Sequence, residues 1–339
     1  MNKGLKDVWG RSFKVGAAVC KETLAYKETD DIIKKHFSSL SIENAMKFGP
    51  IHPSEGKYNW EECDLIADYA RKNKLDMRGH TFVWHNQNPD WLFLDGNEEV
   101  SKNTLYKRLE SHIENVVKRY GDIVYSWDVL NEVIDTDKGD ENGFRISKWY
   151  KICGRDVYEF ALKKMREACP NAKLCYNDYN NESGSKMEAS LRFLSSLLDS
   201  GIPIDCIGIQ GHWYYNFPDE KVLRNAIERY SSLGIDIEFT EVDISVYEWS
   251  EAREVKDFFK SKPLDRIEEQ QKRYYELFTI ASEYPAVKNI TTWGVADNYT
   301  WLDYFPVKDR KNWPLLFDEN NIEKTAVTKL LNASVKGSN

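Results

Sequence analysis

The sequence predicts an α/β protein built as a (β/α)8 barrel, with one domain over residues 1–339. Three observations support this fold class. Short apolar segments alternate with amphipathic ones, the apolar segments number eight, and polar residues gather where these segments end. Strands that alternate with helices form parallel sheets, and eight repeats favour a closed barrel over an open sheet. A chain of 339 residues can bury a core of the required size.

The apolar segments are the predicted strands. In chain order they cover residues 14–19, 38–42, 75–83, 123–130, 173–177, 205–210, 235–242 and 289–295. No G-x-G-x-x-G or Walker loop follows the early segments, which argues against a nucleotide-binding sheet. No long linker or abrupt change in composition divides the chain, so a single domain is predicted.

The segments between the strands show the period of amphipathic helices. The pattern is clearest over 104–120, where apolar residues recur at every fourth position: Leu105, Leu109, Ile113 and Val117. Such a stripe buries one face of a helix against a core. Similar patterns predict helices over 61–73, 156–168, 187–199, 219–232 and 265–284.

Composition and charge exclude several functions. The net charge of −8 argues against a nucleic-acid binder, which needs a basic surface, and against binding to anionic membranes. No stretch reaches the length of a membrane span, and the first twenty residues lack the apolar core of a secretory signal. We therefore expect a cytoplasmic protein, or a secreted one if a signal has been removed. The sequence predicts no particular oligomeric state.

Cysteine and histidine spacing indicates neither a metal nor a cofactor. The six cysteines lack C-x-x-C spacing, and no H-E-x-x-H motif is present. His80 and His85 lie five residues apart near the predicted third strand, so we expect them on opposite faces. His212 is expected to hydrogen-bond a carboxylate. Three other histidines lie away from strand ends and are expected to be structural: His36, His52 and His112.

Polar and aromatic residues follow seven of the eight predicted strands. From the second strand onwards these are Glu43, Asn44 and Lys47; His80, Trp84 and Gln87; Asn131 and Glu132; Asn177, Asp178 and Tyr179; Gln210 and His212; Glu241 and Asp243; and Trp293 with Trp301. The carboxyl ends of barrel strands meet on one face, which carries the active site. A polar residue at one strand end is often structural, but seven such ends together indicate a functional face.

Two glutamates in this set suggest hydrolysis of a glycosidic bond. Glu132 ends the segment WDVLNE, and Glu241 ends IEFTE on the strand face of Ile237 and Phe239. The facing of Glu132 stays open, because strands buried on both sides need not alternate. One carboxylic acid protonates the leaving oxygen while the other carboxylate attacks the anomeric carbon. The alternative is a structural ion pair with Lys47 or an arginine.

The motifs resemble the xylanases of glycoside hydrolase family ten along nearly the whole chain. They are ENAMKF (43–48), RGHTFVWHNQNPDW (78–91), WDVLNE (127–132), YNDYN (176–180), QGHW (210–213), FTEVDI (239–244) and TWGVADNYTWLD (292–303). Their order and spacing make the resemblance specific. It implies a retaining endo-1,4-β-xylanase on a TIM barrel that acts on xylan or xylo-oligosaccharides, without cofactor, metal or carbohydrate-binding module.

The resemblance also implies residue roles. Glu132 is the acid/base and Glu241 the nucleophile, with carboxyls about 5–5.5 Å apart in a retaining enzyme. Asn131 bonds the sugar 2-hydroxyl, and His212 bonds Glu241 while Asp243 holds it. The implied substrate-binding residues are His80 and Gln210 at the cleavage subsite; Glu43, Asn44, Lys47 and Gln87 at the next sugar; Trp84, Trp293 and Trp301 in the walls; and Tyr179 on the leaving-group side.

Two finer expectations follow from the same resemblance. The peptide bond between His80 and Thr81 is expected to be cis. The absent signal resembles short intracellular members of the family, which finish off small imported xylo-oligosaccharides.

Two alternatives remain open at this stage. One is a cellulase or other β-glycosidase on the same barrel plan, against which ENAMKF and TWLD argue. An indole at Trp301 would crowd the hydroxymethyl group that xylose lacks. The other is a catalytically dead sugar-binding barrel, against which both glutamates, Asn131 and the His212–Asp243 pair argue.

Overall fold

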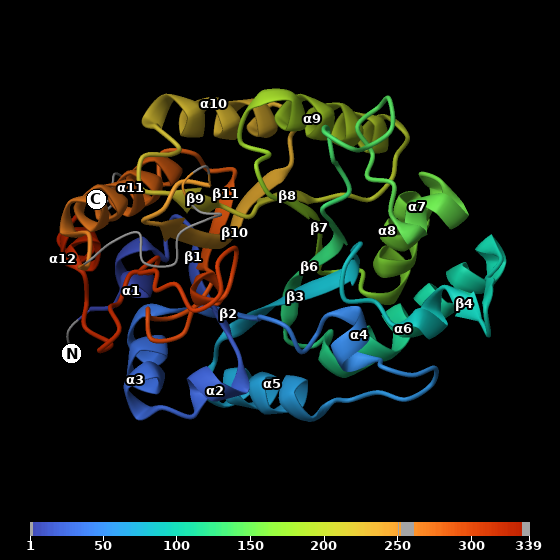
Figure 1. The fold of residues 1–339 in the computed structure, drawn as a ribbon, viewed down its shortest axis with the longest axis horizontal. Helices are drawn as coiled ribbons and strands as arrows, with labels where there is room; N and C mark the ends of the chain where they lie inside the picture. Colours follow the sequence, from blue (N-terminus) through green and yellow to red (C-terminus); the bar gives the residue numbers. More distant parts are fainter. Residues whose placement is uncertain (1–2, 250, 252–260, 334–339) are drawn as a thin grey trace. The chain divides into compact units, whose positions relative to one another are not determined.

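A computed structural model describes residues 3–249, 251 and 261–333 (Figure 1). Its eight parallel strands and the helices between them form a closed (β/α)8 barrel, as predicted. Each predicted strand is present. The strands are β1 (Lys14–Val19), β2 (Ser39–Ile42), β3 (Asp76–Val83), β6 (Val124–Asn131), β7 (Lys173–Asp178), β8 (Cys206–Ile209), β10 (Asp236–Ser245) and β11 (Val287–Thr292). The chain is organised into two compact units.

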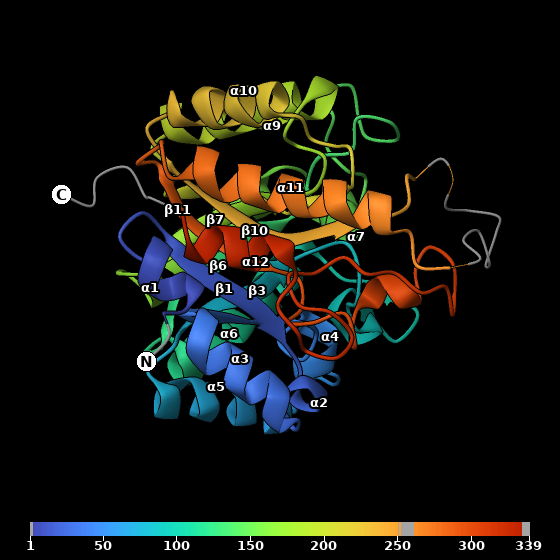
Figure 2. The ribbon, with the colours of Figure 1, turned by 90° about the vertical axis from the view of Figure 1, so that its left-hand side faces the viewer.

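The first unit comprises residues up to 40, 210–231 and 237 onwards. Its central strand β11 is parallel to β1 on one side and β10 on the other, with Ile290 opposite both Val15 and Phe239. The short strand β9 (His212–Tyr214) is parallel to the end of β10. Its helices are α1 (Leu5–Trp9), α2 (Lys21–Leu24), α3 (Lys27–His36), α10 (Glu220–Ser231), α11 (Leu264–Ala281) and α12 (Thr325–Leu331). Figure 2 shows α12 packed alongside α11.

The second unit comprises residues 41–209 and 232–236. Its strands pair in the order β3, β6, β7 and β8, all parallel. Its helices are α4 (Phe48–Ile51), α5 (Glu61–Asn73), α6 (Lys102–Tyr120), α7 (Lys148–Cys153), α8 (Asp156–Ala168) and α9 (Gly184–Asp199). A small hairpin of β4 (Leu94–Asp95) and β5 (Glu98–Glu99) follows the 3-10 turn η1 (Asp90–Leu92).

Local sequence explains α6, the longest helix described. Ser101 caps its start by accepting a hydrogen bond from the backbone N–H of Thr104 (3.2 Å), which satisfies one free donor of the first turn. Gly121 ends it. The predicted apolar stripe is buried, and the helix packs against α8. Among the described residues, no helix is long and apolar enough to cross a membrane.

Candidate active site

In the first unit, β10 carries two buried carboxylates at its end. Glu241 and Asp243 are two residues apart, so they point to the same face of the strand. His212 links them: its Nδ1 lies 3.0 Å from Asp243 Oδ1, and its Nε2 lies 3.3 Å from Glu241 Oε2. Trp301, in the 3-10 turn η2 (Trp301–Asp303), donates its Nε1–H to Asp243 Oδ2 (2.6 Å). The four side chains form one hydrogen-bonded chain.

The charge of His212 follows from these hydrogen bonds. Burial alone would lower its pKa, but the carboxylates of Asp243 and Glu241 outweigh burial and raise the pKa to about 10. His212 is therefore protonated at neutral pH and donates from both ring nitrogens. His212 donates one hydrogen bond to Asp243 and one to Glu241, which fixes the ring and the orientation of the Glu241 carboxylate.

Two more predicted residues join this group. The backbone oxygen of Gln210 accepts a hydrogen bond from the Glu241 N–H (2.9 Å), and the Gln210 side chain is buried. Trp293 follows β11, donates its N–H to the Val242 oxygen (3.0 Å), and has its ring centroid 6.4 Å from that of His212. All six site residues predicted from this unit thus lie together.

In the second unit, the end of β6 holds Glu132 in a left-handed conformation (φ 55°). Its N–H donates to the Asn177 oxygen (2.9 Å), and its carbonyl accepts from Arg145 Nε (2.8 Å). Such a backbone costs roughly 1–2 kcal/mol for a residue with a side chain, so these two bonds maintain it against strain. Asn131, one residue earlier, has its amide 2.9 Å from that of Asn177.

The placement of His85 corrects the sequence analysis. Strand β3 ends at Val83, so alternation along a strand does not reach His85, and the opposite-face argument was wrong. The chain turns after Val83 and brings His85 Nδ1 to 3.5 Å from Glu132 Oε2. Burial lowers the pKa of His85 to about 4, with Arg145 acting in the same direction. The imidazole is therefore neutral near neutral pH.

His80 belongs to a buried group on β3 and β6. Arg78 forms two hydrogen bonds to Asp128 (3.1 and 2.6 Å), and His80 Nδ1 lies 2.9 Å from Asp128 Oδ2. Burial would raise the pKa of Asp128, but Arg78 and His80 outweigh it and the pKa is lowered. The peptide bond between His80 and Thr81 is cis, which confirms the prediction.

The residues after β2 and β3 form a further group. Lys47 donates from Nζ to Asn44 Oδ1 (2.8 Å), and the same ammonium lies 4.8 Å from the ring centroid of Trp84. Glu43 is buried at 9% exposure. The backbone of Gln87 is left-handed (φ 50°), and its oxygen accepts from the Gly49 N–H (2.7 Å). A methyl group at Gly49 would meet that oxygen at 2.6 Å, so this close approach requires glycine.

Tyr179 follows β7 and has two cationic neighbours in this unit. Arg145 Nη2 donates to its hydroxyl (3.0 Å), and Lys186 Nζ lies 3.3 Å from its ring centroid. Lys186 also forms an ion pair with buried Asp178 (2.7 Å). Burial raises the pKa of Asp178, Lys186 opposes this, and Glu132 adds to it.

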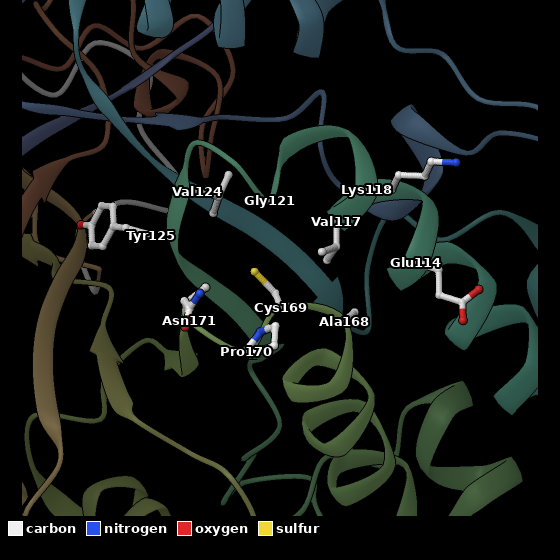
Figure 3. Close-up of a pocket in the computed structure, with 11 residues that line it drawn as sticks. Glu114, Val117, Lys118, Gly121, Val124, Tyr125, Ala168, Cys169, Pro170 and Asn171 are labelled. Carbon is white, nitrogen blue, oxygen red and sulfur yellow. The ribbon is translucent and has the colours of Figure 1, made fainter.

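A separate cavity of about 620 Å³ lies in the second unit. Figure 3 shows Val117, Val124 and Cys169 among the side chains that line it. Val124 begins β6 and Ala172 precedes β7, so the cavity lies at the amino ends of these strands. Barrel enzymes act at the carboxyl ends, where Glu132 and Tyr179 lie.

The family model described as "Glycosyl hydrolase family 10" matches residues 4–333. This chain belongs to glycosyl hydrolase family 10. It is 47% identical over 336 residues to "Endo-1,4-beta-xylanase A" of Caldicellulosiruptor saccharolyticus, covering 98% of this chain and 96% of the relative. It is 42% identical over 330 residues to "Endo-1,4-beta-xylanase" of Geobacillus stearothermophilus, covering 97% and 98%.

Solved structures agree with this membership. A mutant protein in complex with xylotriose superposes with a TM-score of 0.92 at 41% identity, over 97% of this chain and 99% of that one. An endo-1,4-beta-xylanase from Caldicellulosiruptor owensensis gives 0.93 at 42% identity, over 98% and 100%. Family 10 therefore accounts for the whole described barrel.

Several residues that build this family 10 site were missed by sequence reasoning. Asp128 and Arg78 lie inside strands, where a search of strand ends does not look. Arg145 lies in the loop after β6, and Lys186 lies near the start of α9. For Arg78 and Asp128, a signal was present: charged residues inside apolar strands must be paired when buried. For Arg145 and Lys186, no local spacing indicated their contacts with Tyr179.

Proposed function

We propose that this chain is a retaining endo-1,4-β-xylanase that cleaves xylan or xylo-oligosaccharides, with residues 1–339 acting as one domain. One observation carries the proposal. In a family 10 chain whose relatives are named endo-1,4-beta-xylanases, a glutamate stands at the end of β6 and another at the end of β10, each with its own set of partners. The complex of a structural relative with xylotriose supports the same substrate class.

In the proposed mechanism, Glu241 is the nucleophile. One of its oxygens forms a bond to the anomeric carbon as the bond to the leaving oxygen breaks, and Glu132 gives its proton to that oxygen. Glu132 then takes a proton from water, which attacks the glycosyl-enzyme and releases Glu241. Protonated His212 holds Oε2 of Glu241, while Asp243 fixes the His212 ring. This arrangement orients the attacking carboxylate before the reaction begins.

The binding roles are proposed on the positions described above. Asn131 would bond the sugar 2-hydroxyl beside Glu132, with His80 and Gln210 at the same subsite. The next sugar towards the non-reducing end would meet Glu43, Asn44, Lys47 and Gln87. Indole rings bury apolar sugar faces and keep a polar edge for hydrogen bonds, which suits cleft walls; these would be Trp84, Trp293 and Trp301. Tyr179 would receive the leaving group.

We also propose that the enzyme acts in the cytoplasm on imported oligosaccharides. All six cysteines lie in the described part of the chain, where each is buried and outside any disulfide: Cys20, Cys63, Cys153, Cys169, Cys175 and Cys206. Thiols stay reduced in the cytoplasm, whereas oxidising compartments favour disulfides. Fractionation of the native host tests this point, and recovery of the protein in the culture medium would overturn it.

Hydrolysis of two aryl glycosides tests the function. The purified chain is expected to release the aryl group from a β-xylobioside at least about tenfold faster, in kcat/KM, than from the matching β-cellobioside. A difference of this size equals about 1.4 kcal/mol of transition-state binding. A preference for the cellobioside would indicate a cellulase. Hydrolysis of neither substrate, while xylobiose still binds, would indicate a dead sugar-binding barrel.

A further inference from the structure

Arg145 makes three hydrogen bonds from one guanidinium, to three different parts of the second unit. Nε donates to the backbone oxygen of Glu132 (2.8 Å), Nη1 to Asp135 Oδ2 (2.9 Å), and Nη2 to the hydroxyl of Tyr179 (3.0 Å). Its side chain is only 15% exposed. Because the guanidinium is planar and rigid, the three acceptors are held at fixed positions relative to one another.

The first of these three acceptors, the Glu132 carbonyl, belongs to a residue with a strained backbone. The residue has φ 55°, and its N–H is already fixed to the Asn177 oxygen on β7. The bond from Arg145 to the carbonyl fixes the other side of the same residue. With both sides of its backbone held, the direction in which the Glu132 carboxyl leaves the chain is set.

The Tyr179 end is held just as firmly. Its N–H donates to Asp178 Oδ1 (2.9 Å), and the Lys186 ammonium faces the ring at 3.3 Å from the centroid while it pairs with Asp178 (2.7 Å). A cation against the face of an aromatic ring is attracted to its electrons. Because Arg145 binds the hydroxyl and Lys186 faces the ring, both the orientation of the ring plane and the position of the hydroxyl are fixed.

We propose that Arg145 is a positioning residue that couples the acid/base Glu132 to the leaving-group ring of Tyr179. The inference rests on the proposed function. Protonation of a departing sugar requires the Glu132 carboxyl to lie at hydrogen-bond distance from the leaving oxygen. Arg145 contacts both Glu132 and Tyr179, so one rigid side chain sets the relative position of the acid and the leaving group. A leaving group that departs without a proton does not need this relative position.

The test compares two substrates in the variants Arg145→Met and Arg145→Lys. Xylotriose has a sugar leaving group that needs a proton, whereas 2,4-dinitrophenyl β-xylobioside has one that does not. We expect kcat/KM to fall by about a hundredfold on xylotriose, the loss typical of a misplacement of roughly 1 Å, and by less than about threefold on the aryl substrate. Lysine cannot reach three acceptors at once, so it should restore less than about tenfold.

Arg71→Met is the matched control. Arg71 also makes three hydrogen bonds from one guanidinium, to Asp68 and Asp122 on the outside of the same unit. It should affect both substrates equally and by less than about twofold. A double variant that combines Arg145→Met with Tyr179→Phe should lose no more kcat/KM on xylotriose than Arg145→Met alone, because the effects of coupled residues are not additive.

Four outcomes decide between the inference and its alternatives. A selective loss on xylotriose supports it. Equal losses on both substrates would overturn it, because they would show that Arg145 only supports the fold, and so would the absence of any loss. If the unchanged chain cleaved neither substrate, the proposed function itself would be overturned, and this result is distinct from the other three.

Discussion

At the scale of single residues, a protonated histidine lies beside Glu241, the proposed nucleophile. His212 bonds both Glu241 and Asp243, and Trp301 bonds the remaining oxygen of Asp243. These hydrogen bonds give Glu241 a fixed orientation and a positively charged neighbour. An oriented carboxylate is what the proposed double displacement requires of its nucleophile.

Replacing Glu241 tests its role directly. Glu241→Ala should abolish turnover of xylosides, because no group remains to form the glycosyl-enzyme. Added azide should restore activity and give an α-linked xylosyl azide, since it attacks from the face that Glu241 occupied. Glu132→Ala is the matched control and should give a β-linked azide. Proton NMR of the products distinguishes them, and exchanged anomers would reverse the two assignments.

Replacing His212 tests the raised pKa through stability. The folded pKa of about 10 lies above the ordinary value of 6.5, so the protonated form stabilises the folded state fully below pH 6.5. This contribution is lost as the pH rises from 6.5 to 10, by at most about 1.4 kcal/mol per pH unit. Urea unfolding should therefore show the gap between the unchanged chain and His212→Asn shrinking over this range. A gap independent of pH would contradict the assignment.

The sequence predicted the facing of Glu241 but not that of Glu132. Glu241 lies on a strand where alternation gives its facing, and it lies where expected with His212 and Asp243. The facing of Glu132 could not be predicted, because it depends on a left-handed backbone held by Asn177 and Arg145. Asn177 and Arg145 lie 45 and 13 residues after Glu132 in the sequence. Local patterns contain no information on such contacts.

At the scale of elements, an aromatic stack joins α4, α5 and α6. Phe48 stacks on His112 with centroids 3.8 Å apart, and His52 stacks on Tyr58 at 3.9 Å, which in turn stacks on Trp60 at 4.4 Å. His52 and His112 bring their Nδ1 atoms to 3.2 Å. This packing confirms that both histidines are structural. Because α4 follows Lys47 directly, the stack also supports a predicted substrate-binding residue.

The stack predicts loss of stability in acid. Burial lowers the pKa of His52 to about 4 and that of His112 well below 6.5. The unfolded chain therefore binds more protons below pH 6.5, so stability falls as the pH drops from 6.5 towards 4. Urea unfolding of His52→Gln should show a shallower slope in this range, by up to about 1.4 kcal/mol per pH unit. His212→Asn should keep the slope of the unchanged chain here, and a slope unaltered in His52→Gln would contradict the account.

The longest helices were predictable and the shortest were not. The helices over 61–73 and 156–168 coincide with α5 and α8, and the pattern over 104–120 begins two residues after α6 does. Sequence periodicity did not reveal α3, of ten residues, or α12, of seven. It also missed α1, α2, α4, α7 and the β4–β5 hairpin, which span six residues or fewer. A segment of that length completes too few turns for a period to show, and tertiary contacts determine its structure.

At the scale of the whole molecule, the barrel plan accounts for where the proposed site residues lie along the sequence. Each proposed site residue follows a strand or lies in the carboxyl-terminal half of one, towards the functional face of this fold. The fold class was predictable because eight strands and their helices repeat one pattern. The family followed from motifs at the strand ends, where sequence and chemistry coincide.

The proposed place of action predicts a preference for short substrates. An enzyme that meets only imported fragments gains nothing from remote subsites, because short chains do not reach them. We expect kcat/KM to be near its plateau by xylotetraose, with weak action on polymeric xylan. Kinetics on xylotriose to xylohexaose check this. Gains above about tenfold at each added sugar, about 1.4 kcal/mol per subsite, would indicate an enzyme for polymeric xylan.

The stereochemical course of hydrolysis tests the central claim most directly. Proton NMR can follow the first minutes of xylotetraose cleavage by the unchanged chain, before the anomers equilibrate. Double displacement through Glu241, with Glu132 as acid and then base, predicts that the β-anomer of the newly formed reducing end appears first. Appearance of the α-anomer first would mean a single displacement by water, and would contradict the assignment of Glu241 as nucleophile.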